Sequence, residues 1–254
     1  MIELYVPILI SLILFAILGW LISLTTKNVT HVDSMWSLFF VIASLVALYN
    51  IEIMTDRHVM FMTLLILWSS RLCIYLTARN WGAPEDIRYK NIRANNQPNF
   101  HFKSIYIIFL LQAFLAAVVV LPMIAILLDE KVIDTKDIIA ASIITFGLVF
   151  QTIADKQLTS FLKSDDKMQV LNTGLWRYSR HPNYFGEFLI WWGFFIAAAG
   201  SHLWVILLSP ILMTLLLLKI SGVGLMEQTI TSRRLGYQNY IKNTSSFIPW
   251  PPKK

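Results

Sequence analysis

Long apolar stretches are the feature that most constrains the fold of this chain. A helix that crosses a bilayer needs about 20 apolar residues. Stretches of this kind lie near Leu4–Leu24, Met35–Ile53, Val59–Ala78, Ile105–Leu128, Ile138–Leu162 and Phe188–Leu218. The last stretch is too long for one span and is interrupted at Ser201-His202, so we divide it there. The sequence predicts an all-α, polytopic membrane protein with seven transmembrane helices.

The composition excludes several other classes. Charged residues make up 14% of the chain, against about 25% in soluble domains, so a freely soluble globule is excluded. The single cysteine, Cys73, excludes an intrachain disulfide framework and a cysteine-based zinc site. The histidines show no ligand spacing, so we expect no metal. Glu3 and a long apolar run favour a retained first helix over a signal peptide. We expect a single transmembrane domain, residues 1–254.

Lysine and arginine divide unevenly between the two sides that seven helices create. Arg57, Lys131 and Lys136 fall on the side of the N-terminus, whereas seventeen of the 21 basic residues fall on the other side and Arg71 lies in a span. Cytoplasmic loops carry the excess of positive charge in membrane proteins. The bias therefore predicts an external N-terminus and a cytosolic C-terminus. We attribute the net charge of +6 to the membrane surface and expect no nucleic-acid partner.

Charged side chains inside predicted spans are candidates for function, because charge in lipid is costly. Arg71, Tyr75 and Arg79 follow at steps of four and share one helix face. The arginines either extend toward the headgroups or face inward and bind a carboxylate or phosphate. Asp33 opens the second helix, where it either caps the helix or forms a carboxyl group at the mouth of an apolar pocket.

Polar residues recur at steps of four in the fifth and sixth predicted helices. The fifth carries Gly147, Gln151, Asp155 and Thr159, and the sixth carries Asn183, Glu187 and Trp191. The first stripe forms either a hydrogen-bonded seam with a glycine for close approach or the wall of a polar cavity. The glutamate is either favoured by the positive end of its helix or a ligand-binding group.

A basic, aromatic loop joins these two helices and reads GLWRYSRHPNYFGE at residues 174–187. Arg177, Arg180 and His181 gather directly before a helix N-terminus, whose amides also attract anions. A second basic loop, RNWGAPEDIRYK at residues 79–90, lies on the same predicted side. Arginine forms paired hydrogen bonds with phosphate. The two loops therefore suit a nucleotide with several phosphates, or anionic lipid headgroups.

The order of residues in these loops resembles the steroid 5-alpha-reductase-like family, in particular its bacterial membrane branch, and so implies a bacterial inner membrane. RHPNYFGE at 180–187 is the most specific element. Other matching elements are NVTHVDSMW at 28–36, the loop at 79–89, SGVGLME at 221–227 with Gly224 where proline is usual, and the segment 236–252. Isoprenylcysteine and phospholipid methyltransferases carry a similar RHP signature.

The resemblance implies that NADPH lies in a cavity open to the cytosol, formed by the C-terminal part of the chain, about residues 138–254. Together with the basic loops it indicates a set of candidate cofactor-binding residues. These are Arg71, Arg79, Arg88, Tyr89, Asp155, Arg177, Tyr178, Arg180, His181, Asn183, Tyr184, Glu187, Trp191, Glu227, Tyr237 and Tyr240.

The implied reaction is reduction of a carbon–carbon double bond conjugated to a carbonyl, in a lipophilic, steroid-like or isoprenoid, substrate. Hydride reaches the beta carbon while an acid polarises the oxygen. In the steroid enzymes a glutamate and a tyrosine do this work. Asp33 falls near the glutamate and is the candidate catalytic residue, whereas the tyrosine position falls on Trp68. An indole donates a hydrogen bond but is not an acid. Tryptophan in place of this tyrosine therefore affects the expected substrate more than the expected binding of NADPH.

Two other functions fit parts of the sequence. An S-adenosylmethionine-dependent methyltransferase of a lipid or prenylated thiol shares the signature, but its cofactor has no phosphate for two basic loops to bind. A non-catalytic membrane or transport protein would place polar residues across the bilayer, whereas here they gather at the cytosolic helix ends. We therefore expect an NADPH-dependent oxidoreductase acting on CH–CH groups, whose partners are a lipophilic small molecule and membrane lipids.

Overall fold

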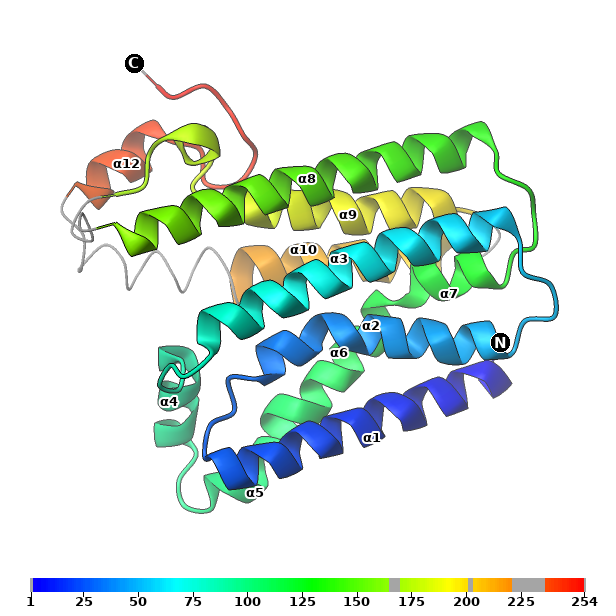
Figure 1. The fold of residues 1–254 in the computed structure, drawn as a ribbon, viewed down its shortest axis with the longest axis horizontal. Helices are drawn as coiled ribbons and strands as arrows, with labels where there is room; N and C mark the ends of the chain where they lie inside the picture. The colour runs from blue at the N-terminus through cyan, green and yellow to red at the C-terminus, as the bar shows by residue number, and fades with distance from the viewer. Residues whose placement is uncertain (1, 165–169, 201–202, 221–235, 254) are drawn as a thin grey trace. The chain divides into compact units, whose positions relative to one another are not determined.

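The computed structural model describes residues 2–164, 170–200, 203–220 and 236–253 (Figure 1). Throughout these ranges the regular structure is helical and includes no β-strand. The predicted all-α class is therefore confirmed for the described part of the chain. The chain divides into two compact units, residues 1–133 and residues 134–254, and each is described by itself below.

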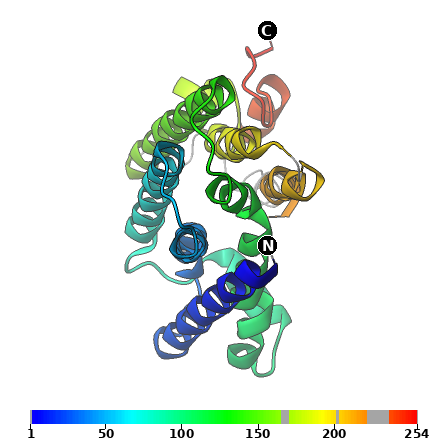
Figure 2. The ribbon, with the colours of Figure 1, turned by 90° about the vertical axis from the view of Figure 1, so that its right-hand side faces the viewer.

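Unit 1 begins with three long helices and continues with a series of shorter ones. The elements are α1 (Ile2–Thr26), α2 (Val32–Tyr49), α3 (Asp56–Asn80), α4 (Ile87–Asn95), α5 (Phe100–Ser104), the π-helix η1 (Ile105–Leu110), α6 (Leu111–Val119) and α7 (Leu121–Leu127). Helix α2 packs against both α1 and α3, as Figures 1 and 2 show. The predicted helix over 105–128 is thus interrupted, and Pro122, which lacks a backbone N–H, stands in the first turn of α7.

Part of the core of unit 1 lies where α2 and α3 meet. Phe40 and Trp68 are fully buried and meet edge to face, with ring centroids 5.4 Å apart. Ser37 Oγ donates to the carbonyl of Ser69 at 2.9 Å, and Ser69 Oγ donates to the carbonyl of Ser37 at 2.8 Å. These reciprocal hydrogen bonds satisfy polar groups that burial would otherwise penalise. Trp68 is therefore part of an aromatic core.

Unit 2 is formed around two antiparallel helices. Its elements are α8 (Thr135–Lys163), the 3-10 helix η2 (Gly174–Arg177), α9 (Pro182–Ala198), α10 (Leu203–Leu215), the π-helix η3 (Leu216–Ile220) and α12 (Tyr237–Asn243). Helix α9 lies along α8 in both views, and α10 packs against α9 (Figures 1 and 2). As the sequence predicts, α9 starts at Pro182, whose fixed φ suits the first helical position.

Five helices of the described residues are long and apolar enough to cross a membrane. They are Leu4–Thr26, Val32–Tyr49, Asp56–Asn80, Phe100–Val119 and Thr135–Lys163, which correspond to the first five predicted spans. Large apolar side chains such as Leu14, Ile74 and Phe146 are more than half exposed. Exposed apolar surface on several long helices is typical of lipid contact, so the protein is an integral membrane protein.

Candidate functional site

In unit 2, two glycines allow the backbones of α8 and α9 to approach closely. A Cβ atom placed on Gly147 would lie 2.7 Å from the carbonyl oxygen of Gly186, and a Cβ on Gly186 would lie 2.7 Å from the carbonyl oxygen of Gly147. Glycine at both positions lets the two backbones touch. The stripe that begins at Gly147 therefore faces α9.

Next to this contact, a buried carboxylate joins the two helices. Gln151 Nε2 donates to Glu187 Oε2 at 2.7 Å, and Trp191 Nε1 donates to Glu187 Oε1 at 3.0 Å. All three residues are at most 4% exposed. One turn further along α8, Asn183 Nδ2 donates to Asp155 Oδ1 at 3.0 Å. Of the two alternatives for the stripe on α8, the structure shows the hydrogen-bonded seam, and this seam contains four of the predicted cofactor-binding residues, Asp155, Asn183, Glu187 and Trp191.

The loop between α8 and α9 is fixed on α8 by side chains outside the predicted set. Trp176 Nε1 donates to the carbonyl of Ala154 at 3.0 Å. Gln157 Oε1 accepts the backbone N–H of Leu175 at 3.0 Å. Gly174 has φ +58°, and a Cβ there would lie 2.4 Å from Gln157 Nε2. Because a positive φ favours glycine, Gly174 lets the loop turn past α8 at this point.

Arg180 holds the segment that follows α12, residues 244–253, against this loop. Its Nη1 atom donates to the carbonyls of Ile241 at 2.9 Å and Thr244 at 2.6 Å. Arg180 is buried, with 8% of its surface exposed. Backbone hydrogen bonds from Arg180 to Ser245 and from Trp250 to Tyr178, each 2.9 Å, continue the contact. Arg180, predicted as a phosphate ligand, thus binds backbone carbonyls here.

Arg177, in contrast, is exposed and lines a pocket of about 460 Å³. The pocket is lined by Val170, Asn172, Arg177, Gly236, Asn239, Tyr240, Asn243, Thr244, Pro252 and Lys253. The hydroxyl of Tyr240 donates to the carbonyl of Trp176, next to Arg177. Two predicted cofactor-binding residues, Arg177 and Tyr240, therefore share one hollow.

The remaining predicted residues of unit 2 surround the same loop. The rings of His181 and Tyr184 stack with centroids 5.5 Å apart and an interplanar angle of 10°, and His181 is 3% exposed. Tyr237 is buried beside Tyr240, with centroids 5.8 Å apart. The Tyr178 side chain is largely exposed. Glu227 lies outside the described residues.

In unit 1, Asp33 is the centre of a second polar group. Arg88 Nη2 donates to Asp33 Oδ2 at 2.6 Å, and the Tyr89 hydroxyl donates to Asp33 Oδ1 at 2.5 Å. Arg88 Nε is held by Asp86 Oδ1 at 3.0 Å. The N-cap residue of α2 is His31, with no side-chain cap hydrogen bond. The alternative that Asp33 merely caps α2 is therefore wrong, because its oxygens accept from Arg88 and Tyr89 instead.

The surroundings shift both partners of Asp33 in the same direction. Burial and the nearby Asp33 carboxylate raise the pKa of Tyr89 well above its ordinary value, although Arg88 opposes this. Burial lowers the pKa of Arg88, but the charge of Asp33 and the hydrogen bond with Asp86 outweigh it and raise the pKa overall. Tyr89 therefore stays protonated and Arg88 stays charged over the physiological pH range.

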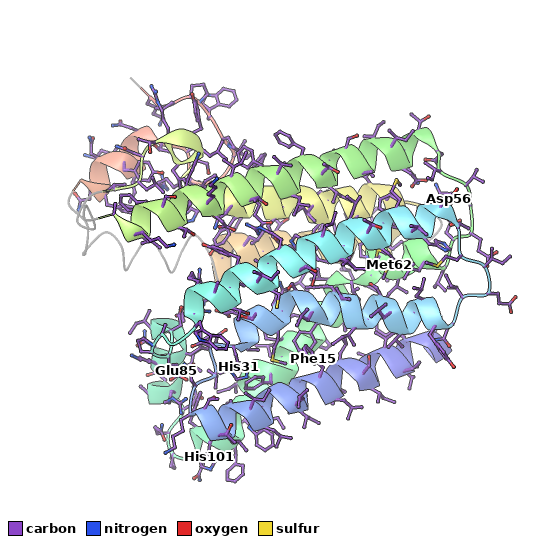
Figure 3. All side chains as sticks on the ribbon, viewed as in Figure 1. Phe15, His31, Asp56, Met62, Glu85 and His101 are labelled. Atoms are coloured by element: carbon purple, nitrogen blue, oxygen red, sulfur yellow. The ribbon has the colours of Figure 1, made fainter. Side chains whose placement is uncertain are left out.

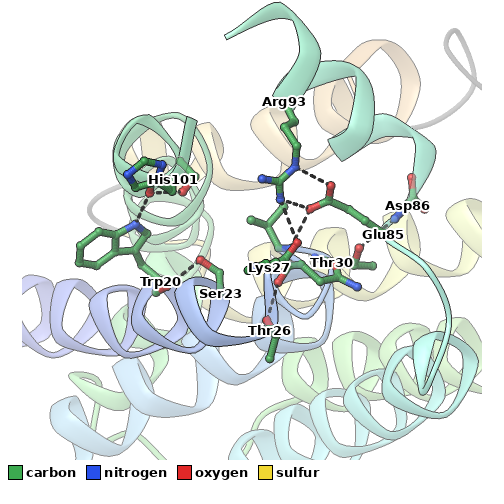
Figure 4. Close-up of polar contacts among 12 residues, drawn as sticks. Trp20, Ser23, Thr26, Lys27, Thr30, Glu85, Asp86, Arg93 and His101 are labelled. Carbon is green, nitrogen blue, oxygen red and sulfur yellow. Dashed lines mark hydrogen bonds and ion pairs between the residues drawn. The ribbon is translucent and has the colours of Figure 1, made fainter. Parts of the chain in front are cut away.

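A clamp between Glu85 and Arg93 positions this group. Arg93 donates from Nη2 to Glu85 Oε1 at 2.6 Å and from Nε to Glu85 Oε2 at 2.8 Å (Figure 4). Glu85 Oε1 also accepts the backbone N–H of Val29 at 3.1 Å, and the N–H of Asp86 donates to Thr30 Oγ1 at 2.9 Å. The clamp thus ties the α1–α2 loop to the segment before α4. Figure 3 shows Glu85 at the end of unit 1 that carries His31, opposite Asp56.

The surroundings of Glu85 and Arg93 favour the charged form of both side chains. Burial raises the pKa of Glu85, but the hydrogen bonds from Arg93 and Val29 and the charge of Arg93 outweigh burial and leave the pKa below its ordinary value. The hydrogen bond with Glu85 and the charge of Glu85 raise the pKa of Arg93, although burial opposes this. Both residues are therefore ionised at neutral pH.

The third helix carries the last two predicted residues, Arg71 and Arg79. Their guanidinium carbons lie 5.6 Å and 5.8 Å from the centroid of the Tyr75 ring, one on each side of it in sequence. The shared helix face that the spacing predicts is confirmed. Tyr75 gives each arginine a cation–π contact.

Comparison with known proteins gives the family. The model of the family described as "Protein of unknown function (DUF1295)", which is steroid 5-alpha-reductase-like, matches residues 19–244. The chain belongs to this family. An uncharacterized protein of Schizosaccharomyces pombe is 31% identical over an alignment that covers 76% of this chain and 65% of that protein. The chain thus spans less than two thirds of that relative's length. No solved structure was found to match.

Three features of this DUF1295 chain were not found by reasoning on its sequence. They are the pairing of Tyr89 with Asp33, the bond from Gln151 to Glu187, and the Glu85–Arg93 clamp. Gln151 and Glu187 each belong to a row of polar residues at steps of four on their helix, and this spacing could have predicted their contact. The clamp had a weaker signal, two adjacent carboxylates at 85–86 followed by basic residues.

Proposed function

We propose that the protein is a membrane-embedded, NADPH-dependent reductase of a carbon–carbon double bond in a lipophilic substrate. The observation that carries the proposal is the hydrogen bond between Asp33 and the largely buried phenol of Tyr89. A carboxyl group and a phenol that share a proton in a site of low solvent access form an acid that can serve carbonyl polarisation. Membership of a steroid 5-alpha-reductase-like family supports the reaction class.

The Asp33–Tyr89 pair would supply the proton of the reaction. When bound, NADPH supplies a hydride to the beta carbon of an enone. Tyr89 would give its proton to the enolate that forms, while the Asp33 carboxylate orients the phenol; the phenolate would then regain a proton from water, so the double bond gains one hydride and one proton. Because its pKa is raised, Tyr89 retains its proton until negative charge develops on the substrate. Arg88, 2.6 Å from Asp33 Oδ2, holds the carboxyl group in place.

The polar groups of unit 2 suit the coenzyme. Glu187 and Asp155 are buried acceptors, each held by an amide donor, Gln151 or Asn183. Such groups match the carboxamide and ribose hydroxyls of a nicotinamide nucleotide. The Arg177 guanidinium makes no hydrogen bond or ion pair within the described part of the chain, which fits a phosphate ligand. The residues present therefore fit NADPH.

The proposed topology has seven spans, with the N-terminus outside and the C-terminus in the cytosol. Helix α9 has 17 residues and is about 26 Å long, close to the roughly 30 Å of a bilayer core. The apolar segment Leu203–Lys219 supplies the seventh span. With this orientation, the basic residues meet the anionic inner leaflet. We place the chain in the bacterial branch of its family, and so in a bacterial inner membrane.

Coenzyme binding by the detergent-purified protein tests the proposal first. We expect saturable NADPH binding, measured by energy transfer from tryptophan, to weaken at least tenfold in Glu187→Gln. Glu52→Gln is the matched control, because Glu52 is exposed. Binding of S-adenosylmethionine without NADPH would replace the reductase by the alternative, a methyltransferase of a lipid or prenylated thiol.

Turnover tests the acid. With a panel of lipophilic enones, Asp33→Asn and Tyr89→Phe should bind NADPH as wild type does. Their rate of NADPH oxidation should be lower by a factor of about 100 or more. Tyr49→Phe, at a tyrosine that is 90% exposed, should match wild type. Wild-type turnover in both Asp33→Asn and Tyr89→Phe would refute the roles assigned to these residues.

A further inference from the structure

The pocket beside Arg177 has a chemistry distinct from that of the buried carboxylates. Its lining contains two cationic residues, Arg177 and Lys253, and three carboxamides, Asn172, Asn239 and Asn243. Its described lining includes no carboxylate. Cations gathered in a hollow without acidic residues raise the local concentration of anions. We propose that this pocket binds a phosphate monoester group.

The hydrogen-bonding capacity favours phosphate over other anions. A phosphate monoester carries about −1.5 to −2 charges and three strong acceptor oxygens, which suits two cations and several amide N–H donors. The side chains of Arg177 and Lys253 make no hydrogen bond or ion pair with the residues that the structure describes. Their donors are therefore not used by the described fold itself.

The pocket is held in shape by hydrogen bonds to backbone carbonyls that do not involve the side chains of Arg177 or Lys253. The N–H of Lys253 donates to the carbonyl of Asn243 at 2.9 Å, which places Lys253 against α12. Ser179 Oγ donates to the carbonyl of Phe247 at 2.7 Å, and Arg180 holds Thr244. Removing the charge of Arg177 or Lys253 thus leaves these supports in place.

The volume indicates what is attached to the phosphate. At about 460 Å³ the pocket is larger than a phosphate ion needs and falls in the range of small-molecule sites. It has room for a ribose or a glycerol unit. Two sources have this chemistry: the 2′-phosphate of NADPH, an assignment that rests on the proposed function, and a lipid headgroup such as that of phosphatidic acid, which does not.

The experiment compares the double variant Arg177→Gln/Lys253→Gln with Lys242→Gln in the detergent-purified full chain. Lys242 is an exposed lysine on α12 outside the pocket lining, so it controls for the loss of charge. The coenzyme arm measures the affinities for NADPH and NADH. The lipid arm uses native mass spectrometry to measure binding of phosphatidic acid and of phosphatidylcholine. Lys253→Arg tests rescue by a retained cation.

If the phosphate is that of the coenzyme, the double variant should bind NADPH at least tenfold more weakly, with NADH unchanged. If it belongs to a lipid, the double variant should lose phosphatidic acid adducts and keep NADPH affinity. Identical binding of every probe by the double variant and Lys242→Gln would overturn the proposal. In that case, a defect in Glu187→Gln would still support the reductase. Conversely, wild-type protein that binds phosphatidic acid through the pocket but not NADPH would refute only the reductase.

Discussion

Replacing Gly186 by alanine should separate α8 from α9 and weaken the polar group between them. The new Cβ would meet the carbonyl oxygen of Gly147 at 2.7 Å and the backbone nitrogen of Gln151 at 2.9 Å. An ordinary contact begins at 3.4 Å, so the facing backbone must retreat by about 0.7 Å. The same retreat would stretch the 2.7 Å bond from Gln151 to Glu187 toward the limit of a hydrogen bond.

Overpacking costs about 1–3 kcal/mol, and weakening a hydrogen bond to a charged group adds about 1 kcal/mol or more. We therefore expect Gly186→Ala to lower the free energy of unfolding by about 2–4 kcal/mol. Unfolding in mixed detergent micelles containing SDS measures it. In Gly193→Ala the nearest atom belongs to the side chain of Ile144, so the loss should be smaller. Gly200→Ala, whose nearest neighbour is 3.8 Å away, is the control. Equal unfolding midpoints for Gly186→Ala and Gly200→Ala would refute the reasoning.

Three further predictions concern the loops. The pKa of Glu85 is lowered in the fold, so its ionised form stabilises the fold at a pH above the ordinary pKa of 4.5. Stability should therefore fall as the pH drops below about 4.5. Glu85→Gln should flatten this pH dependence in acid unfolding curves. Because the pKa of Tyr89 is raised, unfolding above about pH 10 should become easier, and an alkaline profile of Tyr89→Phe that kept this loss would contradict the assignment. Arg180→Lys should lose one of two carbonyl contacts and speed trypsin cleavage after Lys242, whereas Arg177→Lys should cleave at the wild-type rate.

Sequence periodicity was informative where a helix face determines the contacts. The step of four from Gly147 to Asp155 identified the side of α8 that meets α9, and the start of α9 at Pro182 followed from the rigidity of proline. The same periodicity placed Arg71 and Arg79 on either side of Tyr75. In each case the geometry of one helix was enough.

Contacts between loops were beyond the sequence alone. Glu85 accepts from Val29, 56 positions away, and Arg180 reaches carbonyls more than 60 positions away. Nothing in the spacing of such residues determines the distance between them in space. Arginine is also ambiguous, because the N–H groups of its guanidinium donate to backbone carbonyls as well as to phosphate. Composition therefore identified the basic loop but not which arginine faces the pocket.

The dependence of the 174–181 loop on residues 244–253 bears on how unit 2 is made by the ribosome. Both α8 and α9 precede the partner segment in translation, so they reach the membrane while Ser179 and Arg180 still lack the carbonyls of Thr244 and Phe247. Until residues 244–253 are made, the Arg180 guanidinium lacks these acceptors, and burying it without them would be costly, so we expect the loop to stay open to water. We therefore expect the pocket to close after α8 and α9 have entered the membrane, and a nascent chain stalled before residue 244 should expose the loop to proteases.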